Sequence, residues 1–535
     1  MTSPRGHLGP PRALFGAAAV SALLALVPLV YLVVRVVDAG LESVLEVLAR
    51  PRTWETVATS LALTAVVVVA CLAVGLPIAW LLARTSVALR RMWLVLVALP
   101  LAIPSYVAAY AWLAQFPAMS GFWAAALILT LVSAPYVIVP VTASLRSVDP
   151  AMEEVARSLG RSPRQAFVAA TLPQAWPAAA AGSLLVALYV LSDFGAVALF
   201  RVDAFTRVIY ASYRASFDRT SAAVLALVLV ALAATLVLVE RRVRGRARRY
   251  RTSTGAARST TLTALRPRAT ALAFVVLGGY VVLAIVVPVV SLLLRLAEGT
   301  RRPLDPGELA LATVNSAGAS FMGAVLAVLL ALPVAVLAAR YRNRRVSMLE
   351  TAAYSGHALP GVVVGLSLVF FTLAVIPAAY QTIATLAFAY AVLFLPKSIG
   401  ASRSAVGAVP PVLEQTARTL GRSPFTAWTS TTLRIAWPGV AAGGLLVLLT
   451  AMKELPATLM LRPTGFDTLA TELWSRTEVA AYGAAAPYAL ALIALAALPA
   501  WLMSHAMTRR SSGSSAADRG TTDDGSVTTA DTVAA

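Results

Sequence analysis

Long apolar runs alternate along this chain with short polar segments. A transmembrane helix needs roughly 20 consecutive apolar residues, and twelve runs meet that requirement. The first run is longer than the core of a signal peptide and is interpreted as a retained span. We therefore expect an all-α polytopic membrane protein with about 12 transmembrane helices, at 13–34, 58–83, 93–114, 121–144, 177–200, 220–239, 270–294, 317–339, 351–376, 380–400, 438–461 and 481–503.

Two of the polar segments share a pattern that predicts a pair of short helices joined by a sharp turn. The first copy contains EVARSLGRSP from Glu154, and the second contains QTARTLGRSP from Gln415, 261 positions later. One such segment alone is typical of a solvated loop between spans. Two copies in register, each followed by an apolar run, instead indicate a repeated structural element. We call these segments the first elbow, 149–173, and the second elbow, 410–434.

Local sequence signals predict the shape of the first elbow. Asp149 followed by Pro150 provides an N-cap and a proline at the first helical position, and Ser162 followed by Pro163 repeats this signal. Gly160 can adopt the left-handed conformation that ends the first short helix. We therefore expect a rigid helix–turn–helix with a basic surface.

The elbow repeat belongs to a longer internal repeat that divides the chain into two halves of six spans. An even number of spans per half gives both copies the same orientation, so the repeats are parallel and related by an axis along the membrane normal. We expect a first half at 1–240 and a second half at 269–510. A basic cytoplasmic linker is expected at 241–268 and a disordered tail at 511–535.

Charge predicts the orientation of the spans. One side of the membrane comprises mainly segments 35–56, 201–219, 295–316 and 462–480, which hold twelve arginines and twelve acidic residues. The rest of the chain carries the whole net charge of +20. Because basic residues collect in cytoplasmic loops, we expect both termini and both elbows in the cytoplasm. The arginines lie at span ends beside lipid headgroups, which favours membrane lipid over nucleic acid as their partner.

Composition excludes several classes of protein. Hydrophobic residues make up 59% of the chain and charged residues 13%, which excludes a soluble domain. The single cysteine, Cys71, lies in a predicted span, so neither a disulfide framework nor a cysteine metal site is expected. The three histidines are dispersed, and no G-x-x-x-x-G-K-[ST] loop occurs. We expect no enzymatic activity, no catalytic residues, no metal ligands and no cofactor in this chain.

Two acidic residues lie within predicted spans, and the internal repeat superposes them. A charge in the bilayer is costly and normally faces protein or a water-filled cavity. Gly195 follows Asp193, and Pro456 follows Glu454, so the helix is expected to loosen at both acids. These four residues and Lys453 are candidates for a gate on a translocation pathway. The alternative is a structural contact between the halves, in which Lys453 neutralises one of the acids.

The first elbow resembles the coupling motif of ABC-importer permeases, which reads E-A-A, three residues, G, nine residues, I-x-L-P. Glu154, Ala156, Gly160 and the pair Leu172-Pro173 match this motif, while Val155 and Ala170 depart from it. In that family the elbow fits a cleft on a separate ATPase subunit. The resemblance implies that two copies of an ABC ATPase bind the elbows and hydrolyse ATP for this chain.

The second elbow departs further from the motif. Ala417 and Gly421 match, but Gln415 replaces the glutamate, with Glu414 adjacent, and Arg434 replaces the final proline. We expect this elbow to dock in a similar way with different electrostatics. The implied ATPase-coupling residues are Glu153, Glu154, Ala156, Gly160, Glu414, Gln415, Ala417 and Gly421.

The fused twelve-span layout, with the segments around Asp193 and Glu454, resembles the ferric-iron family of permeases. The resemblance implies the type I ABC importer fold, alternating access, and Fe³⁺ delivered by an extracytoplasmic binding protein. No Tyr/His/Glu cage for the ion is visible in the sequence, and Tyr106 and Tyr110 are candidates for pathway walls or for packing.

Other functions remain open at this stage. The resembled family includes relatives for thiamine, phosphonate and sulfate. An ion-coupled secondary transporter also uses parallel repeats and intramembrane acids. A membrane-embedded enzyme is disfavoured because the chain lacks a cluster of nucleophile, base or metal ligands.

Overall fold

The computed structural model describes residues 11–148, 151–214, 218–247, 262–298, 305–341 and 343–496. Most of the described residues are in helices joined by short turns, and an isolated β-bridge links Thr85 and Thr263. The expected tail at 511–535 and residues 248–261 of the expected linker lie outside the described residues, while linker residues 241–247 belong to the helix Arg219–Ala247. Residues 262–266 of the linker are described, and Thr263 exchanges backbone hydrogen bonds with Arg84 and Ser86 after the second predicted span.

The first half is built from the following elements: α1 (Arg12–Asp38), α2 (Leu41–Ala49), α3 (Pro51–Arg84), α4 (Arg90–Ala98), η1 (Leu99–Ala102), α5 (Ser105–Gln115), α6 (Gly121–Ser133), α7 (Pro135–Ser147), α8 (Ala151–Ser158), α9 (Pro163–Ala166), η2 (Phe167–Thr171), α10 (Leu172–Ser192), α11 (Gly195–Leu199), α12 (Phe205–Arg214) and α13 (Arg219–Ala247).

The second half follows the same plan: α14 (Pro267–Val281), η4 (Val282–Val286), α15 (Val287–Ala297), α16 (Pro306–Arg340), α17 (Arg344–Ala353), η5 (Tyr354–Ala358), α18 (Gly361–Val375), η6 (Pro377–Ala379), α19 (Ile383–Gly407), α20 (Pro411–Thr419), α21 (Pro424–Trp428), η7 (Thr429–Leu433), α22 (Arg434–Ala451), α23 (Pro456–Leu461), α24 (Leu469–Glu478) and a helix at Tyr482–Ala496.

The structure accounts for the twelve predicted spans in three ways. Among the described residues, nine helices are long and apolar enough to cross a membrane, and two bent pairs raise this number to 11. The twelfth predicted span, 481–503, begins as the helix Tyr482–Ala496 and then leaves the described part of the chain. The spans predicted at 177–200 and 438–461 are interrupted, because α10 ends at Ser192 and α22 ends at Ala451.

Each half contains one sharply bent span. The helix axis turns by 91° between η1 and α5, and by 98° between η5 and α18. Pro104 and Pro360 stand directly before the second segment of each pair. Proline lacks an N–H and disfavours helical geometry in the residue before it. The bends therefore have a local cause in the sequence, and they bring the N-termini of α5 and α18 into the protein interior.

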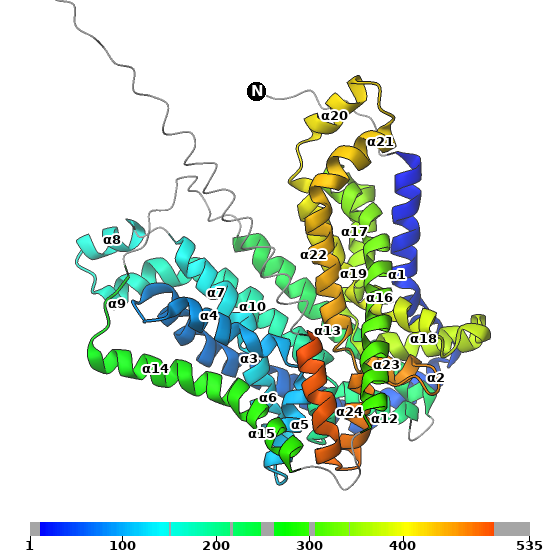
Figure 1. Ribbon diagram of the computed structural model, residues 1–535, viewed down its shortest axis with the longest axis horizontal. Helices are drawn as coiled ribbons and strands as arrows, with labels where there is room; N and C mark the ends of the chain where they lie inside the picture. Colours follow the sequence, from blue (N-terminus) through cyan, green and yellow to red (C-terminus); the bar gives the residue numbers. More distant parts are fainter. Residues whose placement is uncertain are drawn as a thin grey trace, which may run out of the picture.

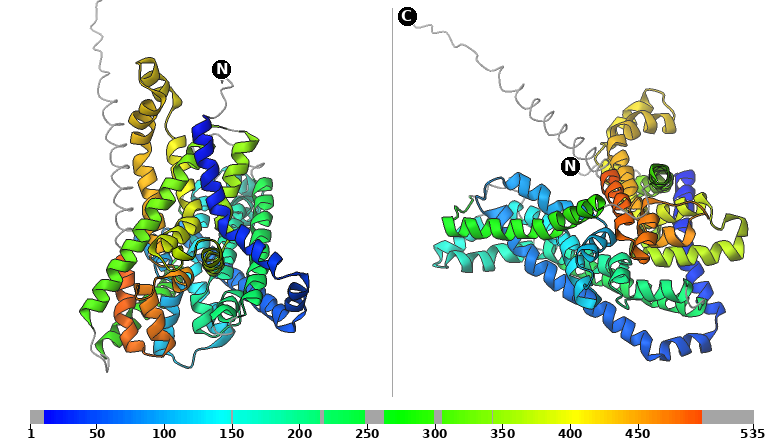
Figure 2. Two further views of the ribbon diagram at one scale, coloured as in Figure 1. Left: turned by 90° about the vertical axis from the view of Figure 1, so that its right-hand side faces the viewer. Right: turned by 60° about the horizontal axis from the view of Figure 1, so that its bottom comes forward.

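The two halves interlock through their first helices. Helix α1 packs against α16, α17 and α18 of the second half, while α14 and α15 lie along α3 to α6 of the first half (Figures 1 and 2). Ala18, Ala22 and Ala25 are buried in the α1 contact, where small side chains let two helix backbones approach closely. In the other contact, Tyr280 donates to the Leu131 carbonyl at 2.9 Å and Ser291 to the Ala111 carbonyl at 2.6 Å.

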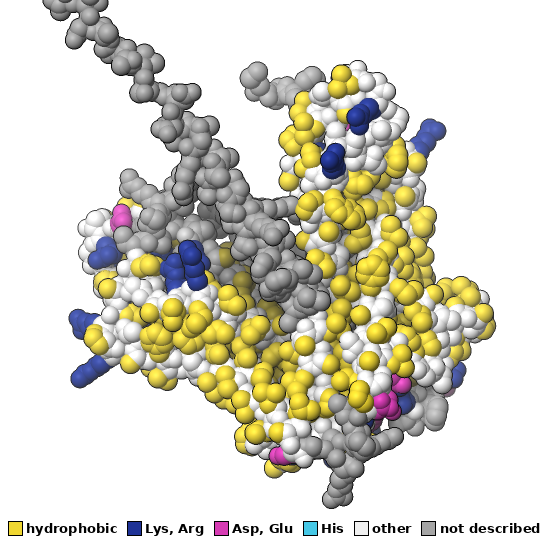
Figure 3. Space-filling model, in the orientation of Figure 1, with side chains coloured by type: hydrophobic (Ala, Val, Ile, Leu, Met, Phe, Trp, Pro, Cys, Tyr) yellow, Lys and Arg dark blue, Asp and Glu magenta, His cyan; other side chains and the backbone are white. Residues whose placement is uncertain are grey.

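The surface of the molecule is that of a membrane protein. Apolar side chains cover the flanks, and the basic side chains in view gather near both elbows (Figure 3). Large apolar residues in the middle of spans are exposed, including Val69 at 66% and Phe321 at 61%. A continuous exposed apolar surface of this kind matches a lipid environment.

Candidate functional site: coupling elbows and intramembrane acids

The turn of each elbow has the geometry that its glycine predicts. Gly160 and Gly421 both have φ of +84°. In the first elbow, the N–H of Arg161 donates to the carbonyl of Ala156 at 3.2 Å, and the N–H of Arg422 makes the equivalent bond to Ala417 at 3.2 Å. These bonds satisfy carbonyl groups at the end of α8 and of α20. The predicted left-handed turn is therefore present in both copies.

The second short helix of each elbow also begins as predicted. Ser162 accepts from the N–H of Gln165, and the Gln165 side chain accepts in return from the N–H of Ser162, which forms a capping box. Ser423 caps α21 in the same way, by accepting from the N–H of Thr426. The cap expected from Asp149 and Pro150 lies outside the described residues.

A glutamate anchors each elbow to the following span. In the first elbow the Thr171 hydroxyl donates to Glu153 at 2.9 Å, and the Arg84 guanidinium lies 3.7 Å from the same carboxylate. In the second, Thr432 donates to Glu414 at 3.2 Å. Both threonines are fully buried, in the π-helical turns η2 and η7. The sequence analysis missed both threonines and Arg84, although the same offset of 261 relates the threonines.

The motif glutamate itself points away from this anchor. Glu154 and its counterpart Gln415 are both exposed, as is Gly160, whereas Ala156 is half-buried and Ala417 is buried. Glu153 and Glu154 therefore have different environments despite being neighbours. The first holds the elbow to the membrane helices, and the second is free to contact another molecule.

The tips of the elbows expose apolar side chains. Met152, Val155 and Leu159 are spaced along one face of α8 and are 60%, 57% and 78% exposed. In the second elbow Leu420 is also 78% exposed, but Thr416 interrupts the equivalent stripe. Exposed apolar side chains grouped together mark a docking surface. The second elbow also exposes Val412, Leu413 and Phe425, at 57%, 41% and 74%, so both elbows present apolar surfaces.

Asp193 lies at the break between α10 and α11 and is only 7% exposed. Its Oδ1 accepts from the N–H groups of Ala196 at 2.9 Å and Val197 at 3.4 Å, so the carboxylate caps α11. Its Oδ2 accepts a hydrogen bond from Ser105, the first residue of α5. The first acid thus joins two half-helix N-termini inside the protein.

Glu454 occupies the equivalent break between α22 and α23 and is 9% exposed. It accepts from the N–H of Ala457 at 3.2 Å and from the N–H of Thr458 at 3.1 Å, and so caps α23. The first residue of α18 is Gly361, and a Cβ there would overlap Oε1 of Glu454. The longer side chain of Glu454 therefore fills the space that the side chain of Ser105 occupies in the first half.

The three remaining candidate residues have structural partners. A Cβ on Gly195 would overlap the Cβ of Tyr106, so only glycine fits between α11 and α5. Pro456 is the first residue of α23, where its missing N–H leaves no bond unmade. Lys453 donates to the carbonyl of Leu101 in the first half at 2.9 Å. Among the described ion pairs, none joins Lys453 to either acid, so its contact between the halves is with a carbonyl instead.

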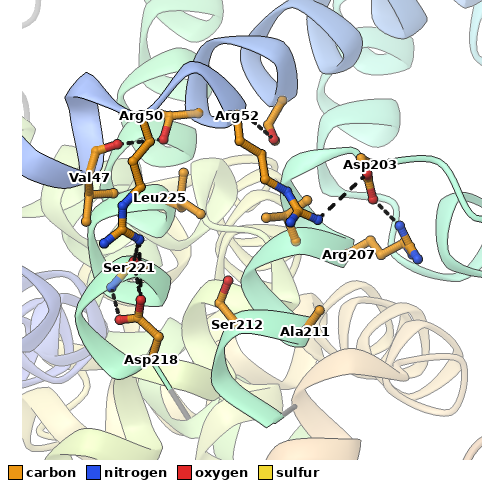
Figure 4. Close-up of a pocket in the computed structure, with 13 residues that line it drawn as sticks. Val47, Arg50, Arg52, Asp203, Arg207, Ala211, Ser212, Asp218, Ser221 and Leu225 are labelled. Atoms are coloured by element: carbon orange, nitrogen blue, oxygen red, sulfur yellow. Dashed lines mark hydrogen bonds and ion pairs between the residues drawn. The ribbon is translucent and has the colours of Figure 1, made fainter. Parts of the chain in front are cut away.

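A charged pocket lies at the other end of α3 from the first elbow. It has a volume of about 240 Å³ and is formed by the start of α3 together with α2, α12 and α13. Arg50 lies 3.5 Å from Asp218, and Arg52 lies 3.9 Å from Asp203, which also pairs with Arg207 (Figure 4). No signal in the sequence indicated this pocket, because its walls come from segments far apart in the chain.

Hydrogen bonding keeps one acid of this pocket ionised. Burial alone would raise the pKa of Asp218, but hydrogen bonds from Ser221 and the nearby charge of Arg50 lower it below its usual value. The pocket therefore presents fixed charges of both signs at neutral pH.

No conventional metal centre is formed by the described residues, since no group of three His, Cys, Asp or Glu side chains could hold an ion. Cys71 is buried, and its thiol lies 3.7 Å from the carbonyl of Thr130.

Comparison with known proteins places these features in a family. Residues 75–249 and 331–511, which contain the two elbows, match the family described as "Binding-protein-dependent transport system inner membrane component". The chain is 35% identical over 478 residues to the Fe(3+)-transport system permease protein FbpB 2 of Haemophilus influenzae, an alignment that covers 89% of this chain and 94% of that protein.

More distant relatives align with part of the chain. The molybdate/tungstate transport system permease protein WtpB of Thermococcus kodakarensis is 28% identical over 30% of this chain and 65% of its own length. The spermidine/putrescine transport system permease protein PotB of Salmonella typhimurium is 29% identical over 27% of this chain and 57% of its own length.

Proposed function

Because this chain belongs to the family of binding-protein-dependent transport system inner membrane components, we propose that it is the fused permease subunit of an ABC importer that carries ferric iron into the cell. The family consists of transport permeases, and the protein is a multi-pass membrane protein. Similarity to the Fe(3+)-transport permease over nearly the full length of both chains is the observation that carries the choice of substrate.

Two external ATPase subunits power the transport cycle in this proposal. The support is the pair of elbows, each with a left-handed glycine and an exposed leucine at its tip. One ATPase subunit binds each elbow, and closure of the ATPase pair on ATP moves the elbows. The contact of Arg84 with Glu153 transmits this movement to α3, and the contact of Thr171 transmits it to α10.

The orientation that we propose places both elbows and both termini in the cytoplasm. The positive-inside charge distribution supports this orientation. The pocket around Arg50 and Asp218 then faces the opposite side, where the binding protein delivers its ion. Charged residues of both signs there are suited to orienting a docking partner.

Growth and ⁵⁵Fe uptake in a strain that lacks this gene test the substrate. We expect the deletion to abolish binding-protein-dependent uptake under iron limitation, with thiamine supplied, and the wild-type gene to restore it. Unchanged iron uptake together with a requirement for thiamine would assign the chain to the vitamin branch of the family. Uptake that persists without the ATPase and follows an ion gradient would instead indicate a secondary transporter.

A further inference from the structure

The charged pocket at the start of α3 contains one arginine without a close partner. The guanidinium of Arg52 lies 3.9 Å from Asp203, at the outer limit of an ion pair, and that carboxylate already pairs more closely with Arg207 (Figure 4). The Arg52 side chain is 75% exposed, and its guanidinium donates no hydrogen bond to the described residues. Arg50, by contrast, donates to two neighbouring side chains. Arg52 is therefore the available cation of the pocket.

The internal repeat identifies the counterpart of Arg52 in the second half. Ser60 of α3 accepts a hydrogen bond at 3.0 Å from the backbone N–H of the first residue of α12. Ser316 of α16 accepts the equivalent bond at 2.8 Å from the first residue of α24. The two serines therefore mark the same place in the two halves. Arg52 stands eight residues before the first serine, and Glu308 stands eight residues before the second.

The second half fills this place with its own ion pairs. Arg476 lies 3.0 Å from Glu308 and 2.9 Å from Glu472. Arg476 is the eighth residue of α24, and the eighth residue of α12 is Ser212, which lines the pocket. The first half thus has a small serine where the second has a large arginine. This difference leaves a hollow in the first half and leaves Arg52 without the partner that its counterpart has.

The size and lining of the pocket suit an acidic side chain. Its volume of about 240 Å³ is below the roughly 300–1,000 Å³ of most small-molecule sites. Val47, Val208 and Leu225 provide an apolar wall for a methylene stem. The guanidinium of Arg52 can bind both oxygens of a carboxylate. The other charged residues of the pocket are already paired with one another, so an entering carboxylate meets one available cation.

We propose that this pocket receives an aspartate or glutamate side chain of the extracytoplasmic binding protein, which pairs with Arg52. This inference rests on the proposed function and orientation, which place the pocket on the extracytoplasmic side. The equivalent place in the second half is closed by its own ion pairs. The two halves therefore present different surfaces to the binding protein, which docks on this repeat-built permease in one orientation. Electrostatic complementarity of this kind fixes register and raises the association rate.

Arg52→Glu tests the proposal, because it reverses the charge of the available cation. Association of the iron-loaded binding protein with the importer complex in nanodiscs is measured at low salt, together with ATP-driven ⁵⁵Fe uptake. We expect the variant to associate about tenfold more slowly than the wild type, and uptake at a limiting concentration of binding protein to fall with it. Arg201→Glu makes the same charge change at an exposed residue of the same predicted side, outside the pocket, and should keep both properties.

A charge exchange distinguishes direct pairing from a general effect of charge. Lysine replaces each exposed acidic residue of the binding protein in turn. One of these changes should restore association with Arg52→Glu and slow association with the wild-type importer. The unfolding temperature of Arg52→Glu should stay close to that of the wild type, because an exposed ion pair contributes little to stability.

The outcomes separate the docking site from the proposed function. Unchanged association in Arg52→Glu, or the absence of any restoring lysine variant, would overturn the docking site and leave the proposed function standing. Uptake that requires Arg52 while association stays unchanged would also overturn it, and would assign the pocket to a small anion. A wild type that binds the binding protein and transports no iron would instead refute the proposed function.

Discussion

At the scale of single residues, the two halves use different side chains to fill the same space. Ser105 and Asp193 form a pair in the first half, whereas Gly361 and Glu454 form the equivalent pair in the second. Asp193 and Glu454 each cap a short helix, and the extra methylene of glutamate takes the volume of the missing serine side chain. The acids are therefore part of the packing at the helix breaks as well as candidates for the pathway.

Because Glu454 fills the space beside Gly361, we predict that Gly361→Ala destabilises the protein. The added methyl group would overlap Glu454 and lie 3.1 Å from Pro456, and such overpacking typically costs about 1–3 kcal/mol. Thermal unfolding of the purified protein measures the effect. Gly279→Ala is the control, because a Cβ there meets nothing within 4 Å and alanine favours a helix interior.

A double variant checks the reason for that result. Gly361→Ser combined with Glu454→Asp recreates the pair of the first half and should recover stability that Gly361→Ser alone loses. A Gly361→Ala protein as stable as Gly279→Ala would contradict this account of the helix breaks.

At the scale of elements, each elbow has an inner and an outer side. Glu153 and Glu414 contact buried threonines, while Glu154, Gln415 and the apolar residues of α8 face outward. The glycine turns and serine caps of the elbows could be predicted from the sequence, because both are local signals. The anchors could not, because Arg84, Glu153 and Thr171 come from three separate segments. The motif identifies Glu154 but not Glu153. The different roles of these two neighbouring residues can be distinguished only in the folded structure.

Substitutions of the neighbouring residues Glu153 and Glu154 should therefore affect different properties of the protein. Glu153→Ala leaves Arg84 and Thr171 without their acidic partner and should lower stability by about 1–3 kcal/mol. Glu154→Arg places a new charge on an exposed surface and should leave the fold intact while it reduces co-purification of the ATPase. Thermal unfolding and pull-down of the ATPase, measured on both variants, separate the two roles. Equal loss of stability in both variants would show that the inner and outer assignments are mistaken.

At the scale of the whole molecule, the two halves of the chain interlock, because each half packs its first helix against the other half. Periodicity and length predicted where the spans lie, and prolines explain why two of them bend. The crossing of α1 onto the second half, and of α14 onto the first, could not be predicted, because alanine-rich helix faces do not specify which partner they contact. The pocket around Arg50 was missed for the same reason, since its residues meet only in the folded chain.

The proposed orientation can be tested by cysteine labelling in intact cells. The native Cys71 is buried and gives little background. An impermeant thiol reagent should modify Glu42→Cys and Asp305→Cys, and should spare Arg161→Cys and Arg422→Cys until the membrane is permeabilised. All four positions are exposed on the protein. Modification of the elbow cysteines in intact cells would show that the elbows lie outside the cell, which would contradict the proposed orientation.

The central claim is that the elbows couple ATP hydrolysis on partner subunits to inward movement of iron through this chain. The most direct measurement is ATP-driven ⁵⁵Fe uptake into proteoliposomes that contain this chain, its ATPase and its binding protein, compared between the wild type and Gly160→Pro. Proline cannot adopt the positive φ of this turn, so we predict ATP-dependent uptake by the wild type and its loss in a variant that remains folded. Full uptake by Gly160→Pro at equal protein abundance would contradict the account.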